Sequence, residues 1–240
     1  MTNNRFPKLT YALVLLLLCA SRSILGFNKL PNGVEVKCIE MERQALLNFK
    51  QGIAVNPGIF STWSDDNRNS DCCKWKGIQC DNETCHVRIL DLLGQNTQYL
   101  KGAINISSLV ALQNIKHLDL NYNNFQGSHI PHLMGSFTHL RYLNLSYSDF
   151  GGSIPSELGK LTHLRYLDLG DNLLYGEIPH QLGKLTHLQY LDLGSNDLHG
   201  QIPYQLGKPI HLQYLDLSIN DLHGELPYQP GKGVLQKMNF

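Results

Sequence analysis

A six-residue segment that recurs at a fixed spacing is the feature that most constrains how this chain can fold. The clearest copy is Leu-Arg-Tyr-Leu-Asn-Leu, which spans residues 140–145. Close copies follow at 24-residue intervals, another precedes it by 25 residues, and a divergent unit comes earlier still; these begin at Leu164, Leu188, Leu212, Ile115 and Val87. One such unit cannot bury its apolar edge alone, so about six units are expected to stack into a solenoid.

Each unit carries the same local signals in the same order. A Leu-x-Leu pair alternating with polar residues predicts a short, half-buried strand. An Asn follows three residues after the second Leu in four units, and a buried Asn at a turn can hydrogen-bond the backbone of its own coil and of a neighbouring coil. A Gly that permits a tight bend comes next. An apolar residue followed by Pro then starts a convex turn that carries further leucines inward, such as Leu158 and Leu161.

Some units depart from this pattern. Gln95 and Ser148 stand where the Asn is expected, so the ladder of Asn side chains is predicted to be interrupted there. Pro209 replaces a convex Leu in the fifth unit, and Pro230 and Gly233 replace both convex leucines in the sixth. The last unit therefore has the weakest predicted core.

The first 26 residues have the features of a secretory signal peptide. Arg5 and Lys8 precede an apolar run from Leu9 to Ala20, which is too short for a membrane span and is followed by small residues as far as Gly26. Cleavage there would leave 17 basic and 20 acidic residues, a net charge of −3, which gives no reason to expect nucleic acid as a partner. No second apolar stretch follows, so no transmembrane segment is expected in the mature chain.

Cysteines and glycosylation motifs agree with secretion. Five cysteines remain after the signal peptide, all in the first part of the mature chain: Cys38, Cys72, Cys73, Cys80 and Cys85. Secretion permits disulfides, so a stapled N-terminal cap followed by a cysteine-free body is expected. Three Asn-x-Ser/Thr motifs predict N-glycosylation at Asn82, Asn105 and Asn144.

The repeat resembles the plant-specific class of leucine-rich repeats, L-x-x-L-x-x-L-x-L-x-x-N-x-L-x-G-x-I-P, from Val87 to about Leu226. The segment upstream is similar to the N-terminal cap of plant leucine-rich-repeat receptors: a helical segment from Cys38 to Lys50, then Ser-Thr-Trp-Ser, then Cys-Cys-Lys-Trp-Lys-Gly-Ile-Gln-Cys. The helix is expected to turn one apolar face inward, and the two Trp side chains to cover the open end of the first coil; the residues concerned are Met41, Ala45, Leu46, Phe49, Trp63 and Trp75.

The resemblance implies an α/β fold: a right-handed leucine-rich-repeat solenoid with a parallel concave sheet behind a disulfide cap. The implied domain organisation is a signal peptide (1–26), a cap (27–86), about six repeats (87–235) and a tail without a C-terminal cap (236–240). It also implies the pairs Cys38–Cys72 and Cys73–Cys80, which spacing alone cannot select. Cys85 then falls outside this pairing scheme. It could form a disulfide with another chain, or it could be a substitution without a disulfide role; the resemblance implies Gly at this position.

In function, the chain resembles the start of the ectodomain of a plant receptor-like protein in defence or signal perception. That implies an extracellular protein, peptide or glycan ligand, a co-receptor kinase as a further partner, and secretion to the apoplast, or the plasma membrane if the chain is part of a longer receptor. Full receptors of this family have more repeats, and the chain resembles about the first quarter of one. The alternatives are a soluble inhibitor similar to polygalacturonase-inhibiting proteins and a truncated receptor fragment with no function of its own.

Outward-pointing strand residues form columns that predict a ligand-binding concave face. The candidate residues are Arg141, Tyr142, Arg165, Tyr166, Asp168, Tyr190, Asp192, Tyr214 and Asp216. Tyr supplies rigid contact area with a polar tip, which suits recognition. The alternative interpretation is that these uniform columns are consensus positions of recently duplicated repeats. A glycan on Asn144 would block part of this face.

A further column lies just before the strands and consists of His139, His163, His187 and His211. The favoured interpretation is that these histidines are solvent-facing consensus residues. The alternative hypothesis is a pH sensor, in which protonation of the histidines on acidification loosens the edge of the sheet. A melting temperature that does not change between about pH 7.5 and 5 would exclude the pH sensor. A linear stack offers no tetrahedral metal geometry, so no metal site or cofactor is predicted.

No enzyme is predicted either. The Asp149-Phe150-Gly151 triplet lies in phase with the repeat, with Phe150 as a core residue, and no glycine-rich loop or other kinase motif accompanies it.

Overall fold

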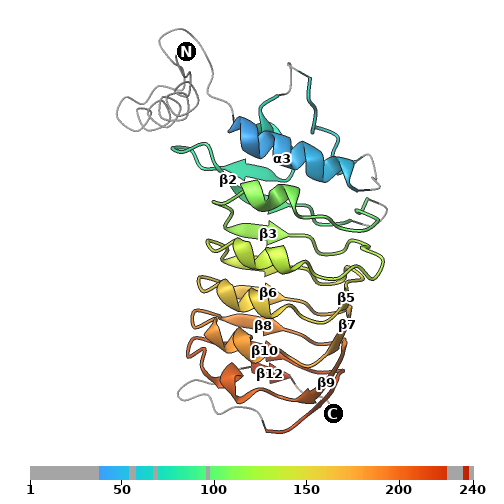
Figure 1. Ribbon diagram of the computed structural model, residues 1–240, viewed down its shortest axis with the longest axis vertical. Helices are drawn as coiled ribbons and strands as arrows, with labels where there is room; N and C mark the ends of the chain where they lie inside the picture. Colours follow the sequence, from blue (N-terminus) through green and yellow to red (C-terminus); the bar gives the residue numbers. More distant parts are fainter. Residues whose placement is uncertain (1–37, 54–57, 67–69, 96–97, 226–234, 238–240) are drawn as a thin grey trace, which may run out of the picture.

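The computed structural model of the chain describes residues 38–53, 58–66, 70–95, 98–225 and 235–237. Figure 1 shows an elongated stack of coils, with one helix across its N-terminal end and short strands aligned in columns along its length. The predicted signal peptide and the positions of Pro230 and Gly233 lie outside the described residues. Among the helices that are described, none is both long and apolar enough to cross a bilayer.

Eight strands form one sheet, and equivalent positions of the Leu-x-Leu pattern set its register. The strands, in sheet order, are β1 (Ile78–Cys80), β2 (Val87–Asp91), β3 (His117–Asp119), β4 (Tyr142–Asn144), β6 (Tyr166–Asp168), β8 (Tyr190–Asp192), β10 (Tyr214–Asp216) and β12 (Leu235–Lys237). Among these described strands, the β1–β2 pair is antiparallel and the others pair in parallel. Equivalent residues of successive repeats lie opposite each other, as Tyr166 does with Tyr190. The predicted parallel concave sheet is confirmed.

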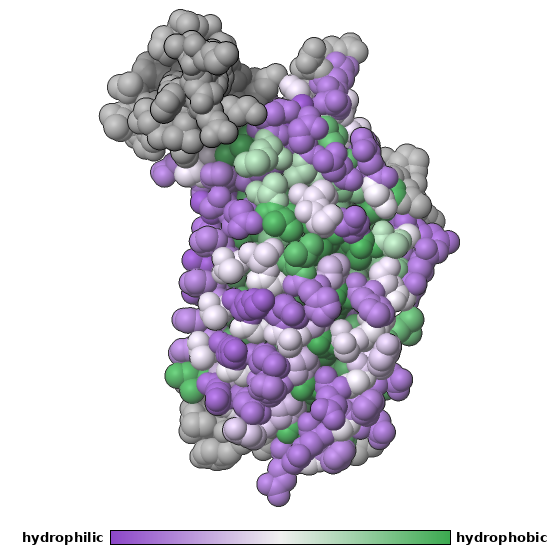
Figure 2. All heavy atoms as spheres, in the orientation of Figure 1, coloured by the Kyte–Doolittle hydropathy of each residue, from purple (hydrophilic) through white to green (hydrophobic). Residues whose placement is uncertain are grey.

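A second sheet runs along another side of the stack, visible in Figure 1 as the column of β5, β7 and β9. Its strands are β11 (Asp221–His223), β9 (Asp197–Gln201), β7 (Leu173–Gly176) and β5 (Gly151–Gly152), in sheet order. The convex side consists of short 3-10 turns: η3 (Ser108–Ala111), η4 (His132–Ser136), η5 (Ser156–Lys160), η6 (His180–Lys184) and η7 (Tyr204–Gly207). In Figure 2, hydrophilic side chains dominate this face over the C-terminal coils, and hydrophobic side chains gather nearer to the end that α3 covers.

The core runs continuously through the coils between these layers. The convex leucines Leu158 and Leu161 have no exposed surface, and Phe125 packs against Phe150 with ring centroids 4.8 Å apart. Burying one such side chain contributes roughly 1.5–3 kcal/mol relative to leaving it in water. Phe150 is thus a core residue, as its repeat phase predicts. Pro209 is also buried, in the place of a convex Leu.

Asn side chains connect successive coils. The amide nitrogen of Asn172 donates to the carbonyl oxygens of Leu169 and Gly170 in its own coil and of Leu145 in the preceding coil. Its amide oxygen accepts the backbone N–H groups of Ser148 and Phe150. The ladder thus satisfies backbone groups that would otherwise be buried without partners.

The predicted interruption of this ladder at Ser148 is wrong. The Ser148 hydroxyl donates to the carbonyl oxygen of Leu120 at 2.9 Å and accepts the backbone N–H of Asn123 at 3.3 Å. A hydroxyl both donates and accepts, so it replaces part of the Asn function. At Gln95 the interruption is real, because this exposed residue pairs locally, through its backbone, with Gln98.

Helix α3 (Glu40–Gln51) covers the N-terminal end of the stack and packs against η3. Its buried face contains Ala45, Leu46 and Phe49, as predicted. Met41 was expected on that face, but its side chain is 68% exposed. The buried place one position later belongs to Glu42, whose two carboxylate oxygens contact the backbone N–H of Val87 and the His86 ring, each at 2.8 Å.

Two tryptophans complete the cap. Trp63 and Trp75 are each 2% exposed and stack with ring centroids 5.3 Å apart. The Trp63 indole N–H donates to the carbonyl oxygen of Lys76, which satisfies its polar group in the core. The expectation that the two rings cover the end of the first coil is consistent with this burial.

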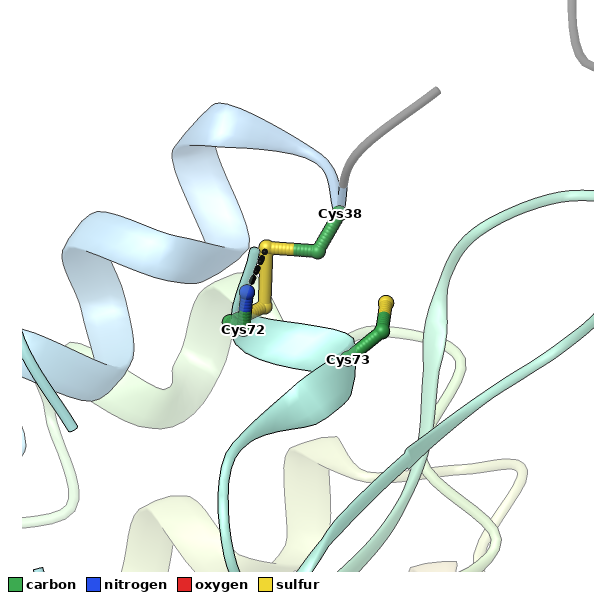
Figure 3. A group of neighbouring side chains, drawn as sticks. All are labelled: Cys38, Cys72 and Cys73. Atoms are coloured by element: carbon green, nitrogen blue, oxygen red, sulfur yellow. Dashed lines mark hydrogen bonds between the residues drawn. A yellow bond between two sulfur atoms is a disulfide. The ribbon is translucent and has the colours of Figure 1, made fainter. Parts of the chain in front are cut away.

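Two disulfides fasten the cap, in the pairing that the resemblance implied. Cys38 before α3 bonds to Cys72 in η2 (Cys72–Lys74), and Cys73 bonds to Cys80 in β1. Figure 3 shows the Cys38–Cys72 bond with the Cys72 backbone N–H directed at the Cys38 sulfur, 3.2 Å away. Although the sulfur atoms of Cys38, Cys72 and Cys73 lie within 4.8 Å of one another, all three are used in disulfides and offer no thiolate to a metal.

Cys85 takes no part in either disulfide and is 5% exposed. Its backbone has a φ of 60°, in the left-handed region where glycine is favoured. The conformation of this turn therefore favours glycine, the residue that the family resemblance leads one to expect at this position.

Candidate binding surface

A continuous stack of aromatic rings runs across the outward face of the concave sheet. It begins with His117 and continues through four tyrosines, one from each following repeat: Tyr142, Tyr166, Tyr190 and Tyr214. Successive ring centroids are 4.1–4.4 Å apart, close to the ~4.8 Å spacing of neighbouring strands. We call this stack the tyrosine ladder. Its rings are half-buried because each covers the next, so edges and hydroxyl groups form the accessible surface.

The hydroxyl groups of the tyrosine ladder are held by the neighbouring column of acidic residues. Within each of the last three repeats Tyr donates to the Asp two residues later, as Tyr166 does to the Oδ2 atom of Asp168 at 3.1 Å. Tyr142 instead donates to Asp119 of the preceding repeat at 3.3 Å, because its own repeat has Asn144 at the Asp position. Each hydroxyl proton is therefore committed, and the oxygen presents lone pairs that a ligand donor could use.

The acidic column has a structural role in the folded protein. The Oδ1 atom of Asp168 accepts the backbone N–H of Gly170, and Asp192 and Asp216 make the same contact two residues on, to Gly194 and Ser218. Asp168 and Asp216 are only 9% and 7% exposed. The three residues were predicted to bind ligand, and their oxygens already shape the turn and orient the tyrosines. We therefore propose that they support the binding face without contacting a ligand directly.

Asn144 is buried at the same position. Its side chain is 4% exposed, its amide nitrogen donates to the Tyr142 hydroxyl, and its oxygen accepts the Ser146 backbone N–H. A glycan attached there would have to displace the Tyr142 contact and disturb the sheet. Asn82 and Asn105 are exposed.

The buried acidic column makes stability depend on pH. Burial raises the pKa of Asp168 to about 6 and raises the pKa of Asp119 and Asp192 in the same direction. The folded state therefore holds a proton on Asp168 at pH values where the unfolded chain has lost it. Stability contributed by this residue consequently falls as pH rises from about 4 through 6.

We expect the Asp168→Asn variant to be more stable than the native chain by about 1–3 kcal/mol at about pH 7, and by much less at about pH 4.5. Asn144 shows that an amide fits the equivalent position. Urea unfolding of both proteins at the two pH values measures the difference. A stability difference that does not change with pH would contradict this role of Asp168. Other titrating groups, such as Asp81 with its lowered pKa, are the same in both proteins, so their effects cancel when the variant is compared with the native chain.

Basic residues border the tyrosine ladder on the side where the strands begin. Arg141 and Arg165 are exposed and occupy equivalent places in adjacent repeats, preceded by the half-buried Lys116. Gln189 and Gln213 replace them in the next two repeats. Each guanidinium group, at the start of one of two neighbouring strands, offers a planar set of donors suited to carboxylate or other anionic groups.

Three of the four predicted histidines form a stacked column, and His211 is exposed in the next repeat. The rings of His139, His163 and His187 stack with centroids 6.4 and 6.5 Å apart, and the Nδ1 atom of each lies 3.1 Å from a carbonyl oxygen of the preceding coil. The rings are exposed, and each is turned to its own backbone contact. Neither the pH-sensor hypothesis nor its alternative is tested by this geometry.

A further group of aromatic residues lies outside the strand columns and was not predicted. Tyr99, Tyr122 and Tyr147 line a surface pocket with Asn124, Asp149 and Asp171. Tyr122 directly precedes Asn123 and Tyr147 directly precedes Ser148, whereas Tyr99 lies four residues after Gln95. The sequence signal that could have found Tyr122 and Tyr147 is a Tyr at a turn position that needs a positive φ.

Two family models match the chain. Residues 86–219, more than half of its length, match the model described as leucine-rich repeat region, and residues 39–81 match leucine rich repeat N-terminal domain. Among curated relatives, the chain is 41% identical to receptor-like proteins EIX2 and EIX1 of Solanum lycopersicum, over 65% and 51% of its own length. It spans only 15% and 13% of theirs.

Solved plant structures share the fold. The PEPR1–AtPEP1 structure matches 84% of the chain with 30% identity and a TM-score of 0.71, over 28% of that chain. The Arabidopsis receptor kinase HAESA, in complex with the peptide hormone IDA and the co-receptor SERK1, matches 77% with 27% identity and a TM-score of 0.59, over 38% of that chain. A plant ice-binding protein matches 78% with 31% identity and a TM-score of 0.69, over 58% of that chain.

Proposed function

Because the chain belongs to the leucine-rich-repeat family, with the N-terminal domain and repeats found in plant receptor-like proteins, we propose that it is an extracellular recognition module. Its ligand is an extended peptide or a protein segment that lies across the concave sheet. Binding rather than catalysis is its role, and secretion or attachment at the plasma membrane is its location.

The observation that carries this proposal is the pairing of two chemically different stripes on one face. The tyrosine ladder presents ring edges and hydroxyl lone pairs, while Arg141 and Arg165 present guanidinium donors beside it. A rigid surface of this kind loses little conformational entropy when it binds, because the rings are already held by stacking and by the acidic column. The stripes favour a ligand with an acidic group opposite the two arginines.

The comparisons support the same proposal. HAESA is a structural neighbour that holds a peptide hormone and a co-receptor, and PEPR1 is one whose structure includes AtPEP1. By analogy, we propose a peptide ligand for this chain and a co-receptor kinase as a further partner. The finer assignment to the apoplast follows from the predicted signal peptide.

A selection experiment tests the proposal even though the ligand is unidentified. The secreted chain, purified from plant cells, is immobilised and used to select from a displayed library of extended peptides. We expect the enriched peptides to be acidic and to lose at least about tenfold in affinity against the Arg141→Ala/Arg165→Ala variant, since a charge-assisted contact is worth about 1.5–3 kcal/mol.

The matched control removes two positive charges from the convex side. Lys160 and Lys184 are exposed at the ends of η5 and η6, so Lys160→Ala/Lys184→Ala should leave the affinity unchanged. Peptides that bind both variants as well as the native chain would refute binding at this face. Stoichiometric inhibition of a secreted pectin-degrading enzyme, with no peptide selected, would instead favour the inhibitor alternative.

A further inference from the structure

A pocket of about 310 Å³ lies outside the concave columns, on the first coils of the solenoid. Tyr99, Tyr122 and Tyr147 supply its apolar lining and are 36%, 54% and 48% exposed. Tyr122 and Tyr147 come from successive repeats and stack in parallel planes, with ring centroids 4.7 Å apart. Three aromatic side chains from three coils thus form one surface, which we call the lateral pocket.

Close packing of the backbone shapes the lateral pocket. A Cβ atom on Gly94 would lie 1.7 Å from the carbonyl oxygen of Tyr122 and 2.9 Å from the Cβ of Tyr99. The Gly94 backbone N–H donates to the carbonyl oxygen of Asn121, which ties the two coils together at this point. Only glycine fits there, and its small size lets Tyr99 approach Tyr122.

The backbone conformation at two of these tyrosines is unusual for a large side chain. Tyr122 and Tyr147 have φ values of 53° and 51°, in the left-handed region that bulky residues rarely adopt. The same conformation occurs at this position in five successive repeats, and the later three hold Asp171, Ser195 and Ile219. The conformation therefore belongs to the repeat, and the feature particular to Tyr122 and Tyr147 is that each places an exposed aromatic ring at this turn.

Charge indicates what the lateral pocket would bind. Its lining includes the carboxylates of Asp149 and Asp171 and no basic residue. Asp171 accepts a hydrogen bond from the Tyr147 hydroxyl, which raises the pKa of Tyr147 to about 12 and keeps that ring neutral. Within the described parts of the chain, the Asp149 carboxylate has no hydrogen-bond or ion-pair partner.

We propose that the lateral pocket binds the side chain of an arginine presented by an extracellular peptide or protein partner. A guanidinium group stacks on aromatic faces and pairs in its plane with carboxylates, and the pocket offers both partners side by side. A lysine would gain the charge but not the planar stacking, and a neutral sugar would leave the two carboxylates without a counter-charge. This second site is separate from the concave face and stands whether or not that face binds peptide.

A titration followed by NMR tests the assignment directly. The isotope-labelled chain receives an acetylated, amidated Gly-Arg-Gly peptide or its citrulline analogue, which has nearly the same shape but no charge. We expect the arginine peptide to shift the backbone amide signals of Tyr122 and Tyr147 and to bind about tenfold more tightly than the citrulline peptide. Equal affinities for the two peptides would overturn the proposal.

Variants locate the effect and keep folding separate from binding. Tyr147→Asn places a residue that tolerates positive φ at this turn, so the melting temperature should stay the same or rise while arginine affinity falls about tenfold. Asp171→Asn should weaken binding with the shape intact. If both variants bound the arginine peptide as tightly as the native chain does, the assignment would be overturned. It would also be overturned if a neutral oligosaccharide shifted the same backbone amide signals at a lower concentration than the arginine peptide.

An exposed aspartate outside the pocket provides the matched control. Asp197→Asn removes the same charge as Asp171→Asn and should bind the arginine peptide as the native chain does, because Asp197 does not line the lateral pocket. An equal loss of binding in both variants would show that net charge, and not the lateral pocket, attracts the peptide.

Discussion

The Asn172→Ala variant is expected to lose about 3–5 kcal/mol of unfolding free energy and to melt roughly 10 °C lower than the native chain. The Asn172 side chain makes five hydrogen bonds, three as donor and two as acceptor, and is 8% exposed. Alanine leaves the backbone N–H groups of Ser148 and Phe150 buried without acceptors, and each such group costs about 1–3 kcal/mol. Chemical unfolding followed by circular dichroism measures the loss.

Two controls make this result specific to the ladder. Asn172→Ser should lose about half as much, because Ser148 already shows that a hydroxyl can take over some of the contacts. Asn220→Ala should also cost less, since Asn220 is half-buried in a coil nearer the C-terminal end of the described repeats. If Asn172→Ala were no more destabilising than an exposed substitution such as Lys184→Ala, the ladder would not be a main source of stability.

Removal of the Cys38–Cys72 disulfide is expected to have the second large effect. The bond closes a segment of 34 residues, and constraining a loop of that length stabilises the folded state by about 4 kcal/mol in the chain-entropy estimate. It also ties the start of α3 to η2 within the cap. The Cys38→Ala/Cys72→Ala variant should therefore be secreted at lower yield and unfold at lower urea concentration.

The second disulfide supplies the matched comparison. Cys73–Cys80 closes only 7 residues, for which the same estimate is about 2.5 kcal/mol. Cys73→Ala/Cys80→Ala should thus be the milder of the two double variants, both in secreted yield and in unfolding free energy. Equal losses would show that loop length does not govern how the cap is stabilised.

The two proposed sites differ in how they arise, although both use tyrosine. In the tyrosine ladder the rings stand in strand positions, and each of the five strands β3, β4, β6, β8 and β10 adds one ring. In the lateral pocket, tyrosines occupy a turn position in only two neighbouring repeats, with Tyr99 beside them. The first surface follows from the consensus; the second is a local departure from it.

Much of the fold was predictable because a solenoid is built from contacts between neighbouring units. The Leu-x-Leu alternation placed the strands, and the fixed period placed Tyr166 opposite Tyr190 independently of any distant contact. The buried face of α3, except Met41, and the two Trp side chains were recognisable through the resemblance to the N-terminal cap of plant leucine-rich-repeat receptors. The strands and their register depend on local periodicity, which can be read directly from the sequence.

Tertiary structure alone decided how polar groups are used once the coils stack. It made Asp168 a buried acceptor for Tyr166 and Gly170, and it let Ser148 continue the Asn ladder. It also placed Glu42, not Met41, in the buried face of α3, because the backbone N–H of Val87 needs an acceptor there.

The lateral pocket was beyond the sequence for the same physical reason. Periodicity tells which side chains point outward, but hydrogen-bond partners and neighbouring rings depend on the distance and rotation between coils, and on backbone angles such as the positive φ at Tyr122 and Tyr147. The sequence by itself thus determined the repeat architecture and the faces of the protein. Only the packing of one coil on the next decided which polar and aromatic groups remain available to a partner.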